Sequence, residues 1–491
     1  MAVIGYSHNS AVYCEKNLKN MKKHQNSCIS ALFVLAIGFI SLNQTAHLSA
    51  VEKYDLTHQI RADQTLNVTA QVQYLGSVIV DRAGQQENQS VLPLDVRGKI
   101  KFDQRMSGGS TTSPQAIRYY DKAVASIKAG KGSTDIALRD DNRIVLARMK
   151  TEEAGNNQFQ IAGIGSTLRQ KEYELLKNPG DPLSYATLFD KRQVKIGDKW
   201  KLGKGQLASL LSMNRIITSS ATMMLKSVEN DVAKIYIYGN VKGEVDDAIS
   251  QQKIKGIAQL NVNEQRITAL RLSIDEERRS GQVAPGFEGK IKFDARLEPT
   301  AENILLDKDR LAQLHKGQKI KFNFLFDRPD CEIQFHHETD WRVIASEKEA
   351  AVLRYMIDGQ LIAQCNVVQL PNRPAQNPLK LSQFQDEVSK IIADSQARIV
   401  AADTLTTESG LEALKISVDG LESDIPFQWI YYHIGNDDGR RTTFVFTLEK
   451  DAVDYFKNAD QVLVQSVNFK APIASTAKAV TPKTTVNRKY K

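Results

Sequence analysis

Apolar and polar residues alternate along much of the chain between residues 66 and 296. From Leu66 to Tyr74 every second residue is apolar, with asparagine, threonine and glutamine between. A period of two predicts a strand with one buried face, as in an antiparallel sheet. Similar runs, separated by polar and glycine-rich segments, occur at residues 96–102, 117–127, 136–139, 144–149, 234–238, 254–262, 269–274 and 289–296.

Helical spacing is confined to the middle of this region. Residues 167–177 and 205–213 place apolar side chains at steps of three and four, and Asn178-Pro179-Gly180-Asp181-Pro182 ends the first segment. Strands on both sides of a helical insert predict one large antiparallel sheet, shaped like a clam or half-barrel, with the helices against one face. Such a sheet either holds an apolar ligand in a cavity or is filled by its own side chains, and both alternatives remain open.

The pattern changes between residues 301 and 329, where we expect a linker with a short helix at 301–314. The next domain, 330–470, is predicted to contain helices at 381–398 and 449–459. Asn436-Asp437-Asp438-Gly439 is a strong hairpin turn. Strands are predicted at 332–335, 341–346, 350–357, 360–368, 399–404, 412–418, 425–434, 441–447 and 462–469. The fold class is therefore α+β, with a β-rich domain at 51–300 followed by this mixed domain.

The first fifty residues have the layout of a secretory signal peptide with an N-terminal extension. Met21-Lys22-Lys23-His24 is basic, residues 31–40 are all apolar or glycine, and Ala46 and Ala50 offer small residues for cleavage. The apolar stretch is about fifteen residues long, whereas a spanning helix needs roughly 20. We expect export to the periplasm or the cell exterior, with an uncleaved N-terminal membrane anchor as the alternative. No later segment is long and apolar enough to span a membrane.

Composition excludes one class of partner. The chain is 42% hydrophobic and 25% charged, which is ordinary for a soluble globular protein. Its formal charge is +8, yet residues 51–470 hold 56 basic and 56 acidic groups. A neutral folded part is not expected to bind nucleic acid, which requires an excess of basic groups. Residues 471–491 carry five basic groups and no acidic one, and we expect a disordered, solvated tail.

The order of elements in the C-terminal part, sheet, helix, meander, helix and strand, resembles the PsbP-like fold. The resemblance covers residues 330–470. It implies an antiparallel sheet with helices on both sides, and a protein that binds partners or assists assembly rather than an enzyme. The residues that carry it are Trp341, Gly359, Ala363-Gln364-Cys365, Phe384, Gln428-Trp429-Ile430-Tyr431-Tyr432, Asp438-Gly439-Arg440 and Ala459-Asp460.

The N-terminal part is similar to β-rich domains of uncharacterised exported bacterial proteins. This likeness is carried by Val194-Lys195-Ile196-Gly197-Asp198-Lys199-Trp200, by Arg118-Tyr119-Tyr120 and by Ala137-Leu138-Arg139. It implies no activity. Gly197-Asp198 is typical of a turn, and Trp200 is expected to anchor the start of a strand in the core.

No motif for catalysis, cofactor binding or metal binding is complete. His336 and His337 are adjacent on a predicted strand and therefore point to opposite faces, so they are not expected to share a metal. Gly130-Lys131-Gly132-Ser133-Thr134 lacks the spacing of a phosphate loop. Gly163-Ile164-Gly165-Ser166 lacks the order of a nucleophile elbow. We therefore predict a protein without enzymatic activity, cofactor or metal.

Two residue pairs are the candidate sites. Cys331 and Cys365 remain after signal removal and can either form a disulfide in an oxidising compartment or stay as two buried thiols. Trp429 and Tyr431 share one face of a predicted strand. They belong to the core if helices cover both faces of the sheet, and otherwise form a binding surface, because aromatic residues dominate interface energetics.

These observations favour an exported, non-catalytic envelope protein that binds a protein partner or a ligand. One alternative is a carrier that holds a lipid or another apolar molecule in the N-terminal sheet. Another is a hydrolase whose catalytic residues are scattered along the sequence.

Overall fold

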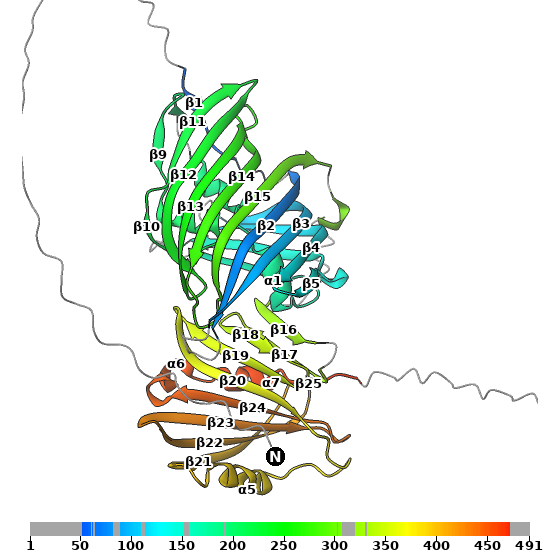
Figure 1. Ribbon diagram of the computed structural model, residues 1–491. Helices are drawn as coiled ribbons and strands as arrows, with labels where there is room; N and C mark the ends of the chain where they lie inside the picture. The colour runs from blue at the N-terminus through cyan, green and yellow to red at the C-terminus, as the bar shows by residue number, and fades with distance from the viewer. Residues whose placement is uncertain are drawn as a thin grey trace, which may run out of the picture.

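The computed structural model describes residues 52–59, 61, 64–81, 89–109, 113–151, 157–190, 193–301, 303–306, 320–328 and 331–471. The predicted signal peptide, most of the linker and the basic tail lie outside the described residues. Two large antiparallel sheets dominate the fold, which confirms the predicted class (Figure 1).

The first sheet has thirteen strands, all of whose pairings are antiparallel. Its order is β7-β6-β4-β3-β2-β15-β14-β13-β12-β11-β9, with β5 paired to β4 and β10 to β12. The described end strands do not pair with each other, so the sheet is open. The strands are β2 (Thr65–Asp81), β3 (Gln89–Gly109), β4 (Pro114–Ala129), β5 (Gly132–Ala137), β6 (Ile144–Thr151), β7 (Asn157–Gly163), β9 (Lys199–Lys201), β10 (Arg215–Ser219), β11 (Thr222–Glu229), β12 (Val232–Val245), β13 (Ala248–Asn261), β14 (Arg266–Arg278) and β15 (Gly286–Thr300).

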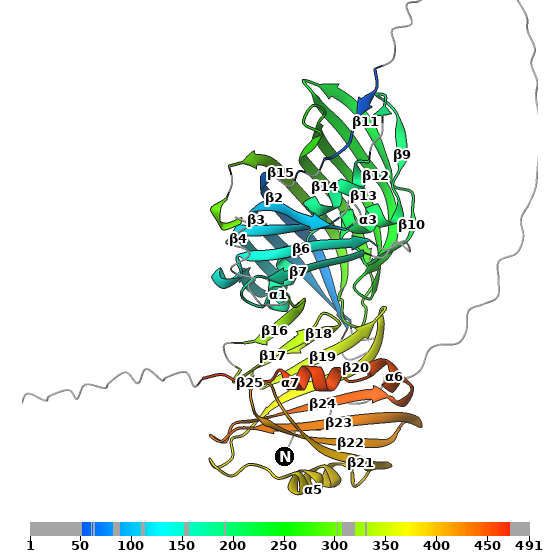
Figure 2. The same ribbon diagram turned by 180° about the vertical axis from the view of Figure 1, so that it is seen from behind.

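The helical insert packs against one face of this sheet. It comprises α1 (Gln170–Leu176), the 3-10 turn η3 (Pro182–Ser184), α2 (Tyr185–Leu188) and α3 (Lys204–Leu211), close to the two segments where helical spacing predicts helices. Figure 2 shows the sheet curving around α3. Leu207 and Leu210 of α3 are fully buried, as are Leu225 and Ile235 of the sheet. The inner face is therefore lined by a packed hydrophobic core.

Short elements complete the N-terminal part. The 3-10 turn η2 (Asp140–Asn142) follows β5, and β1 (Tyr54–Asp55) pairs with β8 (Gln193–Val194). Strands β10 and β11 were not predicted, because their apolar residues form short contiguous runs, Ile216-Ile217 and Met223-Met224-Leu225, without an alternating period. Of the helix expected at 301–314, the described part contains only the 3-10 turn η4 (Ile304–Leu306).

The second large sheet has seven strands in the order β18-β19-β20-β24-β23-β22-β21. A three-stranded sheet, β16-β17-β25, lies beside it (Figure 1). The strands are β16 (Asn323–Asp327), β17 (Ile333–Glu338), β18 (Trp341–Ser346), β19 (Ala350–Ile357), β20 (Gln360–Leu370), β21 (Ala397–Thr406), β22 (Glu412–Glu422), β23 (Ile425–Gly435), β24 (Arg441–Glu449) and β25 (Asn468–Phe469).

Helices pack on both faces of the seven-stranded sheet. α5 (Leu381–Ile392) contacts β21 and β22 on one face. The 3-10 turn η5 (Lys450–Ala452), α6 (Val453–Phe456) and α7 (Ala459–Gln465) belong to the other face, where Phe456 and Leu463 pack with Phe446. This is the layered arrangement expected for the C-terminal part.

Three predicted elements of this domain are wrong in detail. The helix at 449–459 is interrupted, because Lys457 has a φ of +55° and separates α6 from α7. The helix at 381–398 ends at Ile392, and residues from Ala397 onward form β21. The strand at 462–469 is mostly helix α7, with only Asn468–Phe469 in β25. Val462-Leu463-Val464 is a short apolar run that fits either element. Leu463 and Val464 are buried in the core, whereas Val462 is 40% exposed. This is the burial pattern of a helix that buries one face.

The two parts of the chain are joined by direct hydrogen bonds and an ion pair. The Leu325 N–H donates to the Leu168 carbonyl at 2.8 Å, and the Val343 N–H donates to Gln170 Oε1 at 2.9 Å. The Asp327 carboxylate accepts a hydrogen bond from Arg169 of the N-terminal part at 2.5 Å. It accepts another from Lys470, at the end of the C-terminal domain, at 2.8 Å. Burial alone would raise the pKa of Asp327, but hydrogen bonds from Lys470 and Arg169 hold it below its ordinary value.

Candidate functional site

The face of the seven-stranded sheet that carries Trp429 and Tyr431 is only partly covered. At one edge of the sheet, strands β21 and β22 lie under α5. Ile416 and Val418 of β22 are completely buried there. The next strands pair Trp429 with Thr447, and Tyr431 with Val445. All four of these side chains are half-buried. Burial therefore falls where the cover of α5 ends.

The uncovered part continues across β20. Thr447 lies opposite Gln364, and Val445 lies opposite Asn366. We call the six half-buried residues of these three strands the aromatic strip: Trp429, Tyr431, Val445, Thr447, Gln364 and Asn366. Beyond it, Arg354 of β19 donates a hydrogen bond to the Gln282 carbonyl of the N-terminal part. The strip therefore lies between α5 and this contact.

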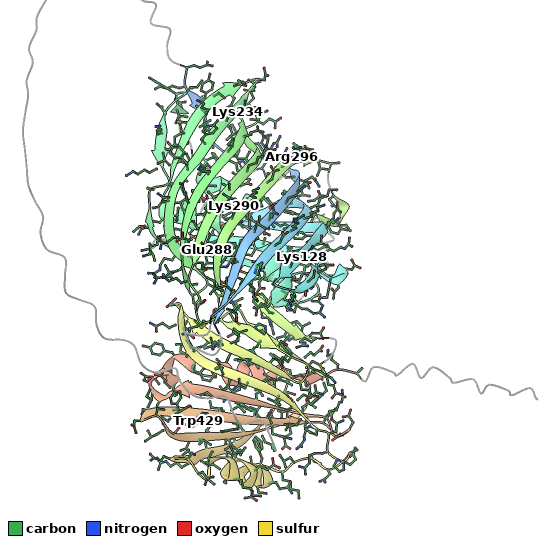
Figure 3. The ribbon with its side chains drawn as sticks, viewed as in Figure 1. Lys128, Lys234, Glu288, Lys290, Arg296 and Trp429 are labelled. Carbon is green, nitrogen blue, oxygen red and sulfur yellow. The ribbon has the colours of Figure 1, made fainter. Side chains whose placement is uncertain are left out.

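Trp429 and Tyr431 are neither fully buried nor fully exposed, and their role as a binding surface stays a prediction. The two side chains pack against the cluster formed by Phe384 and Val388 of α5, so they contribute to the core. Trp429 also stacks on Phe427, with ring centroids 5.8 Å apart. Burial raises the pKa of the Tyr431 phenol above its ordinary value, so the hydroxyl stays protonated and can donate a hydrogen bond. Figure 3 places Trp429 on the seven-stranded sheet.

The strip has the composition of a contact surface. It combines two aromatic rings, one aliphatic side chain, a hydroxyl and two amides. Aromatic residues with a polar end are favoured in interfaces, because they provide apolar area and a hydrogen bond together. None of the six side chains is charged.

The opposite face of β23 carries a buried polar cluster of Tyr432, Asp460 and Lys415, which we call the polar lock. Tyr432 donates a hydrogen bond to Asp460 Oδ2 at 2.7 Å, and Lys415 Nζ lies 2.8 Å from the same oxygen. Tyr432 is fully buried and Asp460 is 1% exposed. Burial, followed by the charge of Asp460 and the hydrogen bond to it, raises the pKa of Tyr432 strongly. The lock joins α7 to the sheet, and the sequence offered no spacing rule that connects these three residues.

The two adjacent histidines occupy different environments, as expected for neighbours on a strand. His337 is 2% exposed and contacts the ring of Phe324, and burial lowers its pKa to about 4. His336 is half-buried, and its backbone N–H donates to Ser466. Within the part of the chain that the structure describes, no three metal-ligating side chains form a cluster that could hold an ion.

The structure places Cys331 at intermediate burial and Cys365 in the core, with no disulfide between the two. Cys365 is fully buried in β20, and burial raises the pKa of its thiol well above the ordinary value. Next to Cys331, the Glu332 N–H contacts the side chain of Gln369. Gln369 lies four residues beyond Cys365 on the same strand, β20.

Two spaces in the N-terminal part bear on the alternative of an apolar ligand. A cavity of about 30 Å³ lies among residues that include His58, Gln104, Leu183 and Arg266. A shallow hollow of about 530 Å³, lined by both apolar and charged residues, lies beside β4 and β5. Both arginines that line it are engaged in ion pairs, Arg139 with Glu172 at 2.8 Å and Arg143 with Asp140 at 2.6 Å. Neither space resembles a site for a lipid chain.

Comparisons with known proteins assign no family. No protein-family model matches the sequence, and no curated protein matches it. Cyanobacterial PsbP from Synechocystis sp. PCC 6803 is similar over 31% of this chain and 96% of its own, with 17% identity and a TM-score of 0.25. A Pseudomonas aeruginosa protein of unknown function, described as a putative regulator, is similar over 30% of this chain and 98% of its own, with 7% identity and a TM-score of 0.22.

A third solved structure, the immunity protein TplEi of Pseudomonas aeruginosa, is similar over 51% of this chain and 95% of its own, with 8% identity and a TM-score of 0.20. At these values the likenesses give this chain no function. Among the described helices, none has the length and apolar character needed to cross a bilayer.

Proposed function

We propose that the chain is an exported, non-catalytic envelope protein that binds a protein partner through the aromatic strip. The observation that carries this proposal is the half-buried state of Trp429 and Tyr431 where the cover of α5 ends. Fully buried rings would be core, and isolated exposed rings would need no explanation. Two aromatic side chains held rigidly against a helix provide a preorganised anchor for a partner.

The sequence supports the compartment. The basic start at Met21, the apolar residues 31–40 and the small residues at Ala46 and Ala50 have the order of an export signal. An uncharged strip suits a protein partner better than a polyanion, because it has no cation to neutralise phosphate or carboxylate groups. The cavity beside His58 and Arg266, of about 30 Å³, is too small for a lipid chain and gives the carrier alternative no support.

A comparative pull-down tests the proposal. The full chain, Trp429→Ala and Tyr455→Ala are used as bait on envelope fractions of the native cell. Tyr455 is the matched control, because it is an aromatic side chain that is 63% exposed and lies on α6 at the other face. We expect one specific protein with wild type and Tyr455→Ala that is lost with Trp429→Ala. Equal recovery by all three baits would contradict the proposal, provided that circular dichroism shows Trp429→Ala to be folded.

A further inference from the structure

The balanced charge of the folded chain conceals two parts of opposite sign. Residues 51–330 contain 43 lysines and arginines against 35 aspartates and glutamates, whereas residues 331–470 contain 13 against 21. The N-terminal part is therefore net positive by eight charges and the C-terminal domain net negative by eight. Such a separation produces a strong local field although the whole is neutral.

The positive charge lies on the outer face of the thirteen-stranded sheet, away from the core. Side chains on this face alternate with buried ones such as Ile254, Ile274 and Ile291. Figure 3 shows Lys234, Lys290, Arg296 and Lys128 spread over the sheet from β12 to β4. Residues that pair across neighbouring strands form rows that run across the sheet. We call the surface formed by four successive outward-facing rows, from β12 to β4, the basic face. It contains twelve lysines and arginines, namely Lys234, Arg296, Lys101, Lys122, Arg271, Lys99, Lys255, Lys292, Arg97, Lys253, Lys290 and Lys128.

Few acidic groups oppose them. The same rows contain Asp294, Asp275 and Asp95, and the bulged Asp121 lies at their edge. Asp294 pairs with Arg271, Asp275 with Lys290, Asp95 with Arg97, and Asp121 with Lys101. At the edge of the face Lys234 pairs with Glu229 at 3.1 Å. Seven of the twelve cations have no carboxylate partner in the salt bridges that join the described residues, and Lys255 and Lys292 are among the seven.

One row of this face has a regular alternation that follows from the strand register. Across the sheet it contains Tyr238, Lys255, Ser273, Lys292, Gln73, Arg97 and Ser126. A cation stands on every second strand, at β13, β15 and β3, and a hydroxyl or amide stands between. Neighbouring strands lie about 4.8 Å apart, so successive cations are roughly 10 Å apart along the row. The row contains no acidic residue.

We propose that the basic face binds a linear anionic polysaccharide, with its chain running along this row. Evenly spaced cations fit a polymer whose acidic groups recur at a similar distance, and the serine and glutamine side chains between them can hydrogen-bond to sugar hydroxyls. Tyr238, 37% exposed at the end of the row, offers an aromatic face and a hydroxyl. This inference goes beyond the proposed function, because it concerns the other sheet and a different kind of ligand.

A membrane surface is the main competing occupant, and the shape of the face disfavours it. The sheet curves around α3, so a flat bilayer touches only part of the outer face (Figure 2). Membrane-surface binding also uses apolar side chains that insert between the lipids. On the basic face the exposed apolar side chains are few: Leu75, 53% exposed, lies between Lys290 and Asp95, and Ile257, 40% exposed, lies between Tyr236 and Arg271. A flexible polymer can follow the curvature.

Calorimetric titration of the full chain with hyaluronan oligosaccharides, which carry one carboxylate on every second sugar, tests the proposal. The variant Lys255→Glu with Lys292→Glu reverses two cations of the row. The matched control, Lys348→Glu with Lys390→Glu, reverses two exposed lysines of the C-terminal domain and changes the net charge equally. We expect wild type and control to bind alike and the row variant to bind at least about tenfold more weakly, with a reduced salt dependence.

Three outcomes would overturn the proposal. The first is no binding of hyaluronan by wild type at low salt. The second is an equal loss of affinity in both double variants, which would mean that net charge alone acts. The third is binding to vesicles of equal parts phosphatidylglycerol and phosphatidylcholine that depends on Lys255 and Lys292 and is tighter than binding to the oligosaccharide. Neutral dextran gives the baseline, and thermal unfolding checks that both variants are folded.

Discussion

Arg118 and Asp181 form a buried ion pair that ties the thirteen-stranded sheet to its helical insert. Arg118 Nη2 lies 2.6 Å from Asp181 Oδ1, Nη1 lies 2.8 Å from Oδ2, and the two side chains are 0% and 6% exposed. Gln104 accepts a further hydrogen bond from Arg118 Nε. Asp181 also caps η3 by accepting from the Leu183 N–H. A single carboxylate thus positions the turn that starts the 3-10 segment.

The turn next to this pair requires glycine. Gly180 has a φ of +75°, and a Cβ there would come within 2.5 Å of the Phe293 ring on β15. Sequence analysis predicted only that a helix stops at residues 178–182. The turn in this segment also positions Asp181 beside Arg118 of the sheet.

Asp181→Asn is expected to destabilise the protein by about 3–5 kcal/mol, because the guanidinium of Arg118 is left buried without its counter-charge. Urea unfolding monitored by circular dichroism measures the change. Asp140→Asn is the control, since its partner Arg143 is partly exposed and such surface pairs contribute about 0–1 kcal/mol. Equal losses in the two variants would contradict the role given to the buried pair.

Tyr432→Phe removes the hydroxyl that hydrogen-bonds to Asp460, and we expect a loss of about 1.5–3 kcal/mol in the free energy of unfolding. The phenyl ring keeps its place in the core, so the fold should persist. Tyr455→Phe at an exposed position should change the same quantity very little. A Tyr432→Phe variant as stable as wild type would show that the lock contributes nothing.

Acid should destabilise the protein before its ordinary carboxylates titrate. Burial lowers the pKa of His337 and of His433 to about 4, and nearby Arg441 and Arg373 add to the effect at His433. The unfolded chain therefore binds these two protons near pH 6.5 and the folded chain only near pH 4. Stability is retained above pH 6.5 and falls as the pH drops toward 4, by up to about 1.4 kcal/mol per pH unit for each histidine.

Urea unfolding at several pH values between 7.5 and 4.5 measures this loss. In His433→Gln the slope of unfolding free energy against pH should decrease by about 1.4 kcal/mol per pH unit in the middle of the range. An unchanged slope would mean that His433 is not the titrating group.

Asp327→Asn should loosen the connection between the two parts of the chain. The substitution removes the charge that attracts Arg169 and Lys470, and the neighbouring Leu325–Leu168 hydrogen bond loses its support. We expect faster deuterium exchange at the Leu325 amide, while amides in the centre of β14 exchange as in wild type. Unchanged exchange at Leu325 would contradict this account of the joint.

The spacing of apolar residues along the sequence correctly predicted those elements in which the apolar positions are also the buried ones. In β2, Val68, Ala70 and Val72 are buried and Thr69 and Gln71 are exposed, as the alternation predicts. The error at α7 came from an apolar run too short to reveal its period. The spacing of cations on the basic face follows from pairings such as Lys292 with Gln73, which join residues far apart in the sequence. No local pattern contains that register.

The candidate site was likewise predicted only in part from the sequence. The sequence placed Trp429 and Tyr431 on one face of a strand, which the structure confirms. It left open whether that face was covered, because this depends on the position of α5, which lies over β21 and β22 and reaches β23 through contacts such as Phe384 with His433. The neighbours Thr447 and Gln364 were not singled out, since only the pairing of β23, β24 and β20 brings them beside Trp429.

Site-specific photo-crosslinking tests the central claim most directly. A benzoylphenylalanine replaces Thr447, which lies opposite Trp429 on β24, in the full chain expressed in its native cell. The same probe at Tyr455 is the control. The account predicts one discrete protein adduct from position 447 that disappears when Trp429→Ala is added, and none of that mass from position 455. The absence of an adduct at position 447, or the same adduct from both positions, would contradict the assignment of the aromatic strip as the partner-binding surface.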